Sequence, residues 1–259
     1  MSQASAFSCA FGDALGNRFL IAPREDLERQ GANPSQVVPL LCEEEFDGLL
    51  VVGDVDPLIQ DVVIWNRDGT PGGVCFNGLC LVATWLGGDS GLFLMDGREV
   101  PWRLTEKGIE LHLTGKSMSK DMQIAMIVTS AGPGLCVPFW NPDCVVPVAD
   151  VDDIDLQMVA DSVRAAELYF PDGANVEIVS EDGPGRVNMR VNERGVGETK
   201  SCGSGAVAVA LSAWAGGLDG PLAVSMPGGT IHLRRASDGG VKLSGEAKID
   251  STKNFSINF

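Results

Sequence analysis

Short segments of apolar or alternating character, bounded by turn residues, dominate the chain and predict a protein rich in β-strand. The predicted strands cover residues 19–21, 49–52, 62–65, 109–113, 122–128, 175–179, 187–191 and 230–233. Explicit turn sequences separate several of them, such as Arg67-Asp68-Gly69 and Glu181-Asp182-Gly183-Pro184. The pattern therefore favours a fold built mainly from short strands.

Helical periodicity is confined to a few segments, which makes the expected fold class α+β. The predicted helices cover residues 35–42, 79–86, 156–167 and 205–214. Asp153 or Asp155 is the expected N-cap of the third. The longest apolar runs, such as Ala206 to Leu211, are far shorter than the roughly 20 residues that a membrane-spanning helix needs, so no membrane association is expected.

One unit of sequence occurs twice. Asn66-Arg67 precedes Cys75-Phe76-Asn77-Gly78 and an apolar helix, and Glu193-Arg194 precedes Cys202-Gly203-Ser204-Gly205 and a second apolar helix. Asn66 and Glu193 each lie nine residues before their cysteine (75 − 66 and 202 − 193). Unless the similarity is chance, this repeat predicts two pseudo-symmetric α+β domains, residues 1–120 and 121–247, with one cysteine from each in the cleft between them.

Charge and the N-terminus narrow the class of protein further. The chain carries 19 basic and 35 acidic residues, a net charge of −16, which argues against nucleic acid as a partner because phosphate binding needs a basic surface. The N-terminus lacks the basic start and long apolar stretch of a signal peptide. A cytoplasmic protein is therefore expected.

The cysteines argue against both a disulfide framework and a metal site. Their number is odd, and they occupy positions 9, 42, 75, 80, 136, 144 and 202. No CxxC pair occurs and the chain has only two histidines, so we expect no metal. Cys9, Cys42 and Cys136 are predicted to be buried and inert.

Cys75 and Cys202 differ from the others because each stands where a strand gives way to small residues and a helix. Backbone N–H groups at a helix N-terminus bind anions such as a carboxylate, and they lower the pKa of a nearby thiol. Two such elements on opposite sides of one carbon supply what inversion of an amino-acid stereocentre needs: one base and one acid. The pair would titrate as a unit, and no pyridoxal phosphate is required.

The residues around both cysteines resemble those of the diaminopimelate epimerases, in the cofactor-independent racemase family that includes proline racemase. The strongest similarity runs from Glu193 to Gly205, and Asn66–Thr70 with Cys75–Gly78 is similar to the first cysteine motif. Shorter similarities occur at 16–19, 141–142, 175–177 and 227–229, so the resemblance spans most of the chain. It also implies that the C-terminal segment 248–259 returns to the first domain.

The resemblance implies a role for each matching position. Cys75 and Cys202 would be the acid/base pair, and the amides of the residues that follow them would hold the reacting carboxylate: Phe76, Asn77, Gly203 and Ser204. Arg194, Asn66 and Asn175 would bind the distant carboxylate of diaminopimelate, and Glu193 its distant ammonium. Asn17 and Asn141 would line the cavity. The resemblance further implies no cofactor, a homodimer and a place in lysine biosynthesis.

The sequence departs from the family pattern mainly near the first cysteine. Phe76 stands where the family has glycine, and Asp143 stands where a histidine is expected after Asn141-Pro142. An aspartate disfavours a thiolate nearby. Three functions stay open at this point: a divergent diaminopimelate epimerase, a racemase or epimerase of another amino acid, and an amino-acid-binding protein that has lost catalysis.

Overall fold

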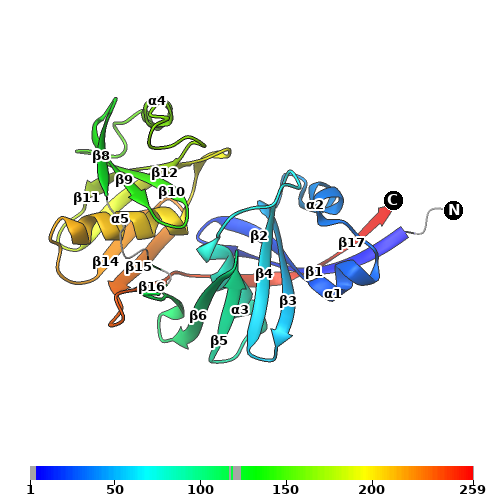
Figure 1. The fold of residues 1–259 in the computed structure, drawn as a ribbon. Helices are drawn as coiled ribbons and strands as arrows, with labels where there is room; N and C mark the ends of the chain where they lie inside the picture. Colours follow the sequence, from blue (N-terminus) through cyan, green and yellow to red (C-terminus); the bar gives the residue numbers. More distant parts are fainter. Residues whose placement is uncertain (1–3, 117, 119–123, 259) are drawn as a thin grey trace. The chain divides into compact units, whose positions relative to one another are not determined.

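The computed structural model describes residues 4–116, 118 and 124–258, which divide into two compact units (Figure 1). Residues 1–111 and 245–259 form the first unit, and residues 112–244 form the second. The domain boundary predicted near residue 120 lies outside the described residues.

The first unit is a mixed sheet with three helices. Its strands are β1 (Ala4–Ala14), β2 (Asn17–Pro23), β3 (Gly48–Asp56), β4 (Ile59–Asn66), β5 (Ser90–Met95), β6 (Arg98–Thr105), β7 (Gly108–Leu113) and β17 (Lys248–Asn258). Its helices are α1 (Arg24–Arg29), α2 (Pro34–Cys42) and α3 (Phe76–Leu86). The strands pair in the order β17-β1-β2-β3-β4-β5-β6-β7, so the C-terminal strand lies antiparallel to the N-terminal one.

The second unit contains a sheet of the same kind and two helices. Its strands are β8 (Ala125–Thr129), β9 (Gly132–Pro138), β10 (Pro142–Pro147), β11 (Asn175–Glu181), β12 (Arg186–Glu193), β13 (Gly197–Thr199), β14 (Leu222–Met226), β15 (Gly229–Arg235) and β16 (Val241–Ser244). Its helices are α4 (Leu156–Arg164) and α5 (Gly203–Ala215). The order is β8-β9-β10-β11-β12-β14-β15-β16, and the short β13 also pairs with β12.

The two units repeat one pattern of strand directions. In the first unit β2–β3 and β4–β5 are the parallel pairs, and the other neighbours in the order are antiparallel. In the second unit β10–β11 and β12–β14 take the same two places in the order. Strands β2 and β3 are thus equivalent to β10 and β11, which allows the two cysteine segments to be compared position by position.

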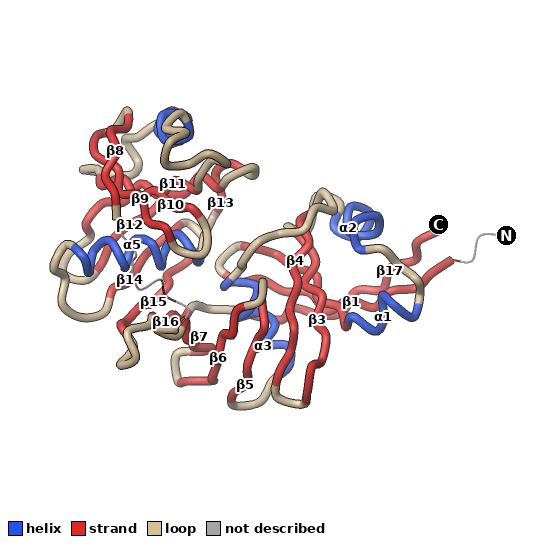
Figure 2. Tube along the Cα trace, in the orientation of Figure 1, coloured by secondary structure: helices blue, strands red, loops and turns tan. Residues whose placement is uncertain are grey.

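One helix in each unit is apolar around most of its circumference and is packed into the sheet. Helix α3 contacts β1, β2, β3 and β17, whereas α5 contacts β9, β10, β11, β14 and β15 (Figure 2). Both begin earlier than the apolar pattern predicts, at the residue that directly follows the cysteine. The reason is that Cys75 and Cys202 are themselves the N-caps.

The remaining helices cover the outer parts of each core. Asn33 caps α2 through a hydrogen bond from the Ser35 N–H, and Asp155, rather than Asp153, caps α4. Helix α4 ends at Arg164, three residues before the predicted end. Within the described residues, no helix is long and apolar enough to cross a membrane.

Seven of the eight predicted strands lie within observed strands. In the prediction for residues 122–128, residues 122 and 123 are outside the described residues, and residue 124 precedes β8, which begins at Ala125. The strands that the pattern did not indicate include β1 and β17, whose residues mix small, polar and charged types. These two form a long antiparallel pair, and backbone pairing between distant segments is invisible to local periodicity.

Helix α2 offers a matched test of its packing. The Leu41 side chain is 1% exposed within an apolar cluster under α2, and the neighbouring Leu40 side chain is 54% exposed. We expect Leu41→Ala to lower the free energy of unfolding by about 2–5 kcal/mol because it leaves a cavity. Leu40→Ala should change it by no more than about 0.5 kcal/mol. Urea unfolding followed by circular dichroism measures both, and equal effects would contradict this packing.

Candidate active site: two cysteine-capped helices

The first half-site is the junction between residue 75 and helix α3. Cys75 has an extended backbone (φ −129°, ψ 99°), and its Sγ accepts a hydrogen bond from the Gly78 N–H at 3.3 Å. The Cys75 N–H donates to Met95 Sδ at 3.5 Å. The cysteine is half-buried. Its sulfur therefore lies at the positive end of a buried helix.

The second half-site has the same construction at helix α5. Cys202 is extended (φ −140°, ψ 116°), and its Sγ accepts from the Gly205 N–H at 3.4 Å. Its own N–H donates to Met226 Sδ at 3.5 Å. The Ser204 hydroxyl lies 3.4 Å from the sulfur, and the cysteine is only 6% exposed. The sequence repeat thus corresponds to a repeated cap in which even the methionine contact recurs.

The first-turn amides divide in the same way in both helices. In α3 the Gly78 and Leu79 N–H groups donate to the sulfur and the carbonyl of Cys75. In α5 the corresponding N–H groups of Gly205 and Ala206 serve Cys202. The two residues between each cysteine and its glycine are the ones whose N–H groups are predicted to hold a carboxylate: Phe76, Asn77, Gly203 and Ser204. The geometry suits anion binding beside each sulfur.

An asparagine at the start of a strand contacts the first turn of each helix: Asn17 is the first residue of β2, and Asn141 directly precedes β10. Asn77 Nδ2 donates to Asn17 Oδ1 at 2.8 Å, and Asn141 Nδ2 donates to Ser204 Oγ at 2.9 Å. Asn17 and Asn141, both predicted to line the cavity, therefore lie directly beside residues predicted to bind the carboxylate.

The residues predicted to bind the distant end of the substrate lie at strand ends. The Arg194 N–H donates to Asn175 Oδ1 at 2.9 Å, and the exposed Arg194 guanidinium donates to the Asp172 carbonyl at 3.2 Å. Glu193 accepts a short hydrogen bond from the Thr199 hydroxyl. In the first unit, Asn66 Nδ2 donates to Thr70 Oγ1 at 3.1 Å. In the second unit Asn175 is thus joined to the Arg194 backbone, and Glu193 precedes Arg194 in the chain.

The electrostatic environment of Cys202 opposes the effect of its helix. Burial raises the pKa of the Cys202 thiol well above its ordinary value, and the carboxyl groups of Glu193, Asp143 and Glu177 raise it further. The nearby Ser204 hydroxyl lowers it by a smaller amount. The prediction of a lowered thiol pKa at this helix N-terminus is therefore wrong for Cys202, because desolvation and three acidic neighbours outweigh the helix.

Two of these three carboxyl groups, those of Asp143 and Glu177, are buried inside the second unit. The sequence pattern singles out Asp143 and predicts no role for Glu177. Asp143 on β10 and Glu177 on β11 are both fully buried. Burial raises the pKa of Asp143 to about 7 and that of Glu177 well above its ordinary value. A signal for Glu177 was present, because a charged residue stands in the middle of the otherwise apolar run from Val176 to Val179.

The other singled-out residues have structural positions. Cys9, Cys42 and Cys136 are buried as predicted, and burial raises the thiol pKa of Cys9 and Cys42 to about 12. The Phe76 side chain is only 1% exposed, so it belongs to the core. Among the described residues, no group of three or more His, Cys, Asp or Glu side chains is arranged to hold a metal ion.

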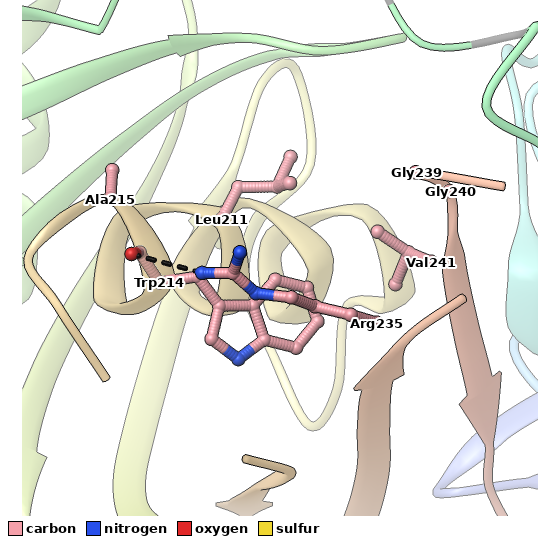
Figure 3. Close-up of a pocket in the computed structure, with 7 residues that line it drawn as sticks. All are labelled: Leu211, Trp214, Ala215, Arg235, Gly239, Gly240 and Val241. Carbon is pink, nitrogen blue, oxygen red and sulfur yellow. Dashed lines mark hydrogen bonds between the residues drawn. The ribbon is translucent and has the colours of Figure 1, made fainter. Parts of the chain in front are cut away.

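A pocket in the second unit lies away from this chemistry (Figure 3). It is lined by Leu211, Trp214, Ala215, Arg235 and residues 239–241. The Arg235 guanidinium covers the Trp214 ring at 5.4 Å and donates to the Trp214 carbonyl at 3.1 Å. Trp214 is near the C-terminal end of α5, about 18 Å along the helix from Cys202. The pocket is therefore not part of the candidate active site.

The sequence relatives of this chain and the family profile that matches it carry the same name. The family profile "Diaminopimelate epimerase" matches residues 136–249. A diaminopimelate epimerase of Corynebacterium glutamicum is 34% identical over 93% of this chain and 95% of its own length. One of Streptomyces coelicolor is 32% identical over 92% of this chain and 91% of its own.

Solved structures share the fold at much lower sequence identity. A phenazine biosynthesis protein of the PhzF family from Enterococcus faecalis superposes with a TM-score of 0.72 at 13% identity, over 96% of this chain and 99% of that one. A hydroxyproline epimerase from Agrobacterium vitis, solved with trans-4-hydroxy-L-proline bound, gives a TM-score of 0.63 at 11% identity over 100% and 95% of the two chains.

The close approach of Glu177 to helix α5 can be tested at Gly205. A Cβ at Gly205 would lie 2.7 Å from Glu177 Oε1. We expect Gly205→Ala to lower the free energy of unfolding by about 1–3 kcal/mol, because the buried carboxylate has little room to move. Gly216→Ala, at the other end of α5 with negative φ and no contact shorter than 3.4 Å, should change it by less than about 1 kcal/mol. A tolerated alanine at 205 in urea unfolding would contradict the contact.

Proposed function

We propose that this chain, which belongs to the diaminopimelate epimerase family and is an isomerase, interconverts LL- and meso-diaminopimelate with Cys75 and Cys202 as its acid/base pair. The reaction needs no organic cofactor, because a thiolate and a thiol suffice to remove and return the α-proton. The observation that carries the proposal is the repeated cap, with each cysteine sulfur at the N-terminus of a buried helix.

The chemistry follows from the two caps. One thiolate takes the α-proton and becomes a thiol, while the other thiol gives its proton to the opposite face of the same carbon and becomes a thiolate. Negative charge that builds on the α-carboxylate is stabilised by first-turn N–H groups. The Gly78 N–H donates a hydrogen bond to the Cys75 sulfur, and the Gly205 N–H donates one to the Cys202 sulfur. Each of these bonds stabilises the thiolate form of its cysteine. The roles reverse for the other stereoisomer.

Arg194, Asn175 and Glu193, which lie at neighbouring strand ends, support a substrate with a second charged end. An arginine fork matches a carboxylate, and a glutamate is the complementary charge for an ammonium. Asn175 is oriented by its two hydrogen bonds, one from the Arg194 N–H and one to Asp143. Diaminopimelate carries both of these groups at its distant end, which is why it is the proposed substrate.

A racemase or epimerase of another amino acid is the second candidate, and one observation favours it. Asp143 occupies the position where the family pattern has histidine, and its carboxyl is hydrogen-bonded to Asn175 at 2.9 Å. An acidic group at that point changes the charge that a substrate meets. A panel of amino acids separates the two candidates.

The reaction is tested by proton NMR of the reduced protein in deuterium oxide with LL-diaminopimelate. We expect loss of the α-proton signal and formation of the meso form. Cys75→Ala and Cys202→Ala should each reduce the rate by at least about 100-fold, because each removes one of the two proton-transfer groups.

Cys136→Ala is the matched control, since it removes a buried cysteine outside the proposed machinery and should keep the rate. Exchange that persists in both active-site variants would sink the two-cysteine reaction. Exchange absent with diaminopimelate but present with another amino acid would select the second candidate. Absence with every amino acid would leave only a binding protein.

Arg194→Lys tests the distant carboxylate separately. Lysine keeps the positive charge but loses the planar fork, so we expect KM for diaminopimelate to rise about 10- to 100-fold. The exchange rate of an amino acid that lacks a second carboxylate should not change. An unchanged KM for diaminopimelate would show that Arg194 does not bind the substrate.

A further inference from the structure

Two carboxyl groups that the proposed reaction does not use lie against the helix that carries Cys202. Asp143 on β10 pairs with Asn175 on the parallel strand β11, and Glu177 is two residues further along β11 on the same face of the sheet. The contact of Glu177 with the position of Gly205 shows that this face is turned towards the first turn of α5.

The hydrogen bonds of the two carboxyls are incomplete unless they hold a proton. Asp143 Oδ1 accepts from Asn175 Nδ2 at 2.9 Å. Asp143 Oδ2 and both Glu177 oxygens are fully buried, and none of the three has a hydrogen-bond partner of ordinary geometry among the described residues. The Ser204 hydroxyl is near enough to lower the pKa of Asp143, but by less than the other groups do. Two ionised carboxylates cannot bond to each other because both only accept. One proton between them supplies the missing donor and removes one of two buried charges.

The two groups act on each other directly. Burial raises the pKa of Glu177 most, and repulsion from Asp143 raises it further. Burial also raises the pKa of Asp143, a hydrogen bond from Glu177 opposes that rise, and the net result is a pKa of about 7. The direction of both effects puts the proton on Glu177 and the charge on Asp143. At pH values above the Asp143 pKa of about 7 the pair therefore carries one proton and one negative charge.

The negative charge of this pair acts on Cys202 over a short distance, because both carboxyl groups raise the pKa of its thiol. The Ser204 hydroxyl lies 3.4 Å from Cys202 Sγ and also acts on the Asp143 carboxyl. Of the other titratable groups, Glu193 from β12 acts on both the Asp143 carboxyl and the Cys202 thiol. Cys144 of β10 and Cys136 of β9 lie in the core cluster on the opposite face of the sheet, with residues of α4. On β15, Arg235 contacts Trp214 at the far end of α5. A thiolate at Cys202 would thus form beside existing negative charge.

The first unit has apolar residues at the equivalent positions. By strand register, Phe19 of β2 corresponds to Asp143, and Leu50 of β3 corresponds to Glu177. The helix contacts agree, because a Cβ at Gly78 would meet the Leu50 side chain where one at Gly205 meets Glu177. The carboxyl pair is therefore a difference between two otherwise repeated half-sites.

We propose that Asp143 and Glu177 form a proton-sharing carboxyl pair that holds Cys202 as the thiol in the free enzyme. The two are positioning residues, acting through Cys202 rather than on the substrate. In the reaction proposed above, on which this assignment rests, Cys75 then takes the α-proton and Cys202 donates its own in the favoured direction. The resulting Cys202 thiolate must recover a proton, and Cys75 must lose one, before that direction can repeat.

The experiment measures the pH dependence of alkylation at Cys202 in the reduced full-length protein. Iodoacetamide is the probe, and peptide mass spectrometry reports Cys202 separately from the other cysteines. The midpoint of the pH profile is compared between variants, because it reports ionisation, whereas the high-pH plateau reports access. No amino-acid substrate is used, so failure here leaves the proposed reaction standing, and failure of the NMR exchange does not affect this result.

Amide substitutions separate one shared charge from two independent ones. Glu177→Gln and Asp143→Asn each replace the shared proton by an amide and leave one charge, so each alone should leave the alkylation rate at a pH about one unit above the Asp143 pKa within about twofold. The double variant removes the charge and should raise the Cys202 rate constant about 10-fold or more below the midpoint. Glu181→Gln, at the exposed end of β11, is the control for loss of one acidic residue and should have no effect.

Other outcomes overturn the proposal. Equal, additive accelerations by the two single variants would mean that both groups are ionised and share no proton. A double variant with the wild-type midpoint would mean that the pair does not act on Cys202. If the double variant does not fold, infrared spectroscopy of the wild type and Glu177→Gln decides: the carbonyl band of a protonated carboxyl should be present in the first and lost in the second, and its absence from the wild type would refute the shared proton.

Discussion

Each unit is organised by the need to bury a helix that is apolar on nearly every side. Helices α3 and α5 cannot present a polar face to water, so strands must pack around them, and α5 contacts five strands of its unit. A helix buried in this way still has unpaired N–H groups at its start. In both units a cysteine sulfur accepts one of them, from Gly78 or Gly205. The same requirement that satisfies the helix therefore positions the reactive atom.

A repeated backbone does not impose repeated chemistry. The strand directions, the cysteine cap and the methionine contact occur in both units, yet Phe19 and Leu50 correspond to Asp143 and Glu177. Burying two carboxyls is unfavourable compared with burying two apolar side chains of similar volume. A group that costs stability beside a cysteine is more readily understood by its effect on that cysteine than by its effect on the fold.

Local pattern was a good guide to elements and a poor guide to their ends. The apolar runs located all four predicted helices, but α3 and α5 begin at the residue after each cysteine, because cysteine is an unusual cap. The six-residue helix α1 was not predicted, and β1 and β17 were missed because their stability comes from pairing with each other. The helix-based expectation for the thiol of Cys202 failed because it considered one field and omitted burial and three carboxyls.

The sequence by itself determined the repeat, the α+β class, the two cysteines at the starts of apolar helices and the resemblance to one family. These follow from local periodicity and from spacing along the chain, which need no knowledge of distant neighbours. Only the tertiary structure decided that Glu177 lies against Gly205, that Asp143 is hydrogen-bonded to Asn175 and that both carboxyls act on Cys202. Those contacts join segments that are far apart in sequence, and the charge a buried group feels depends on which segments the sheet and helix bring to it.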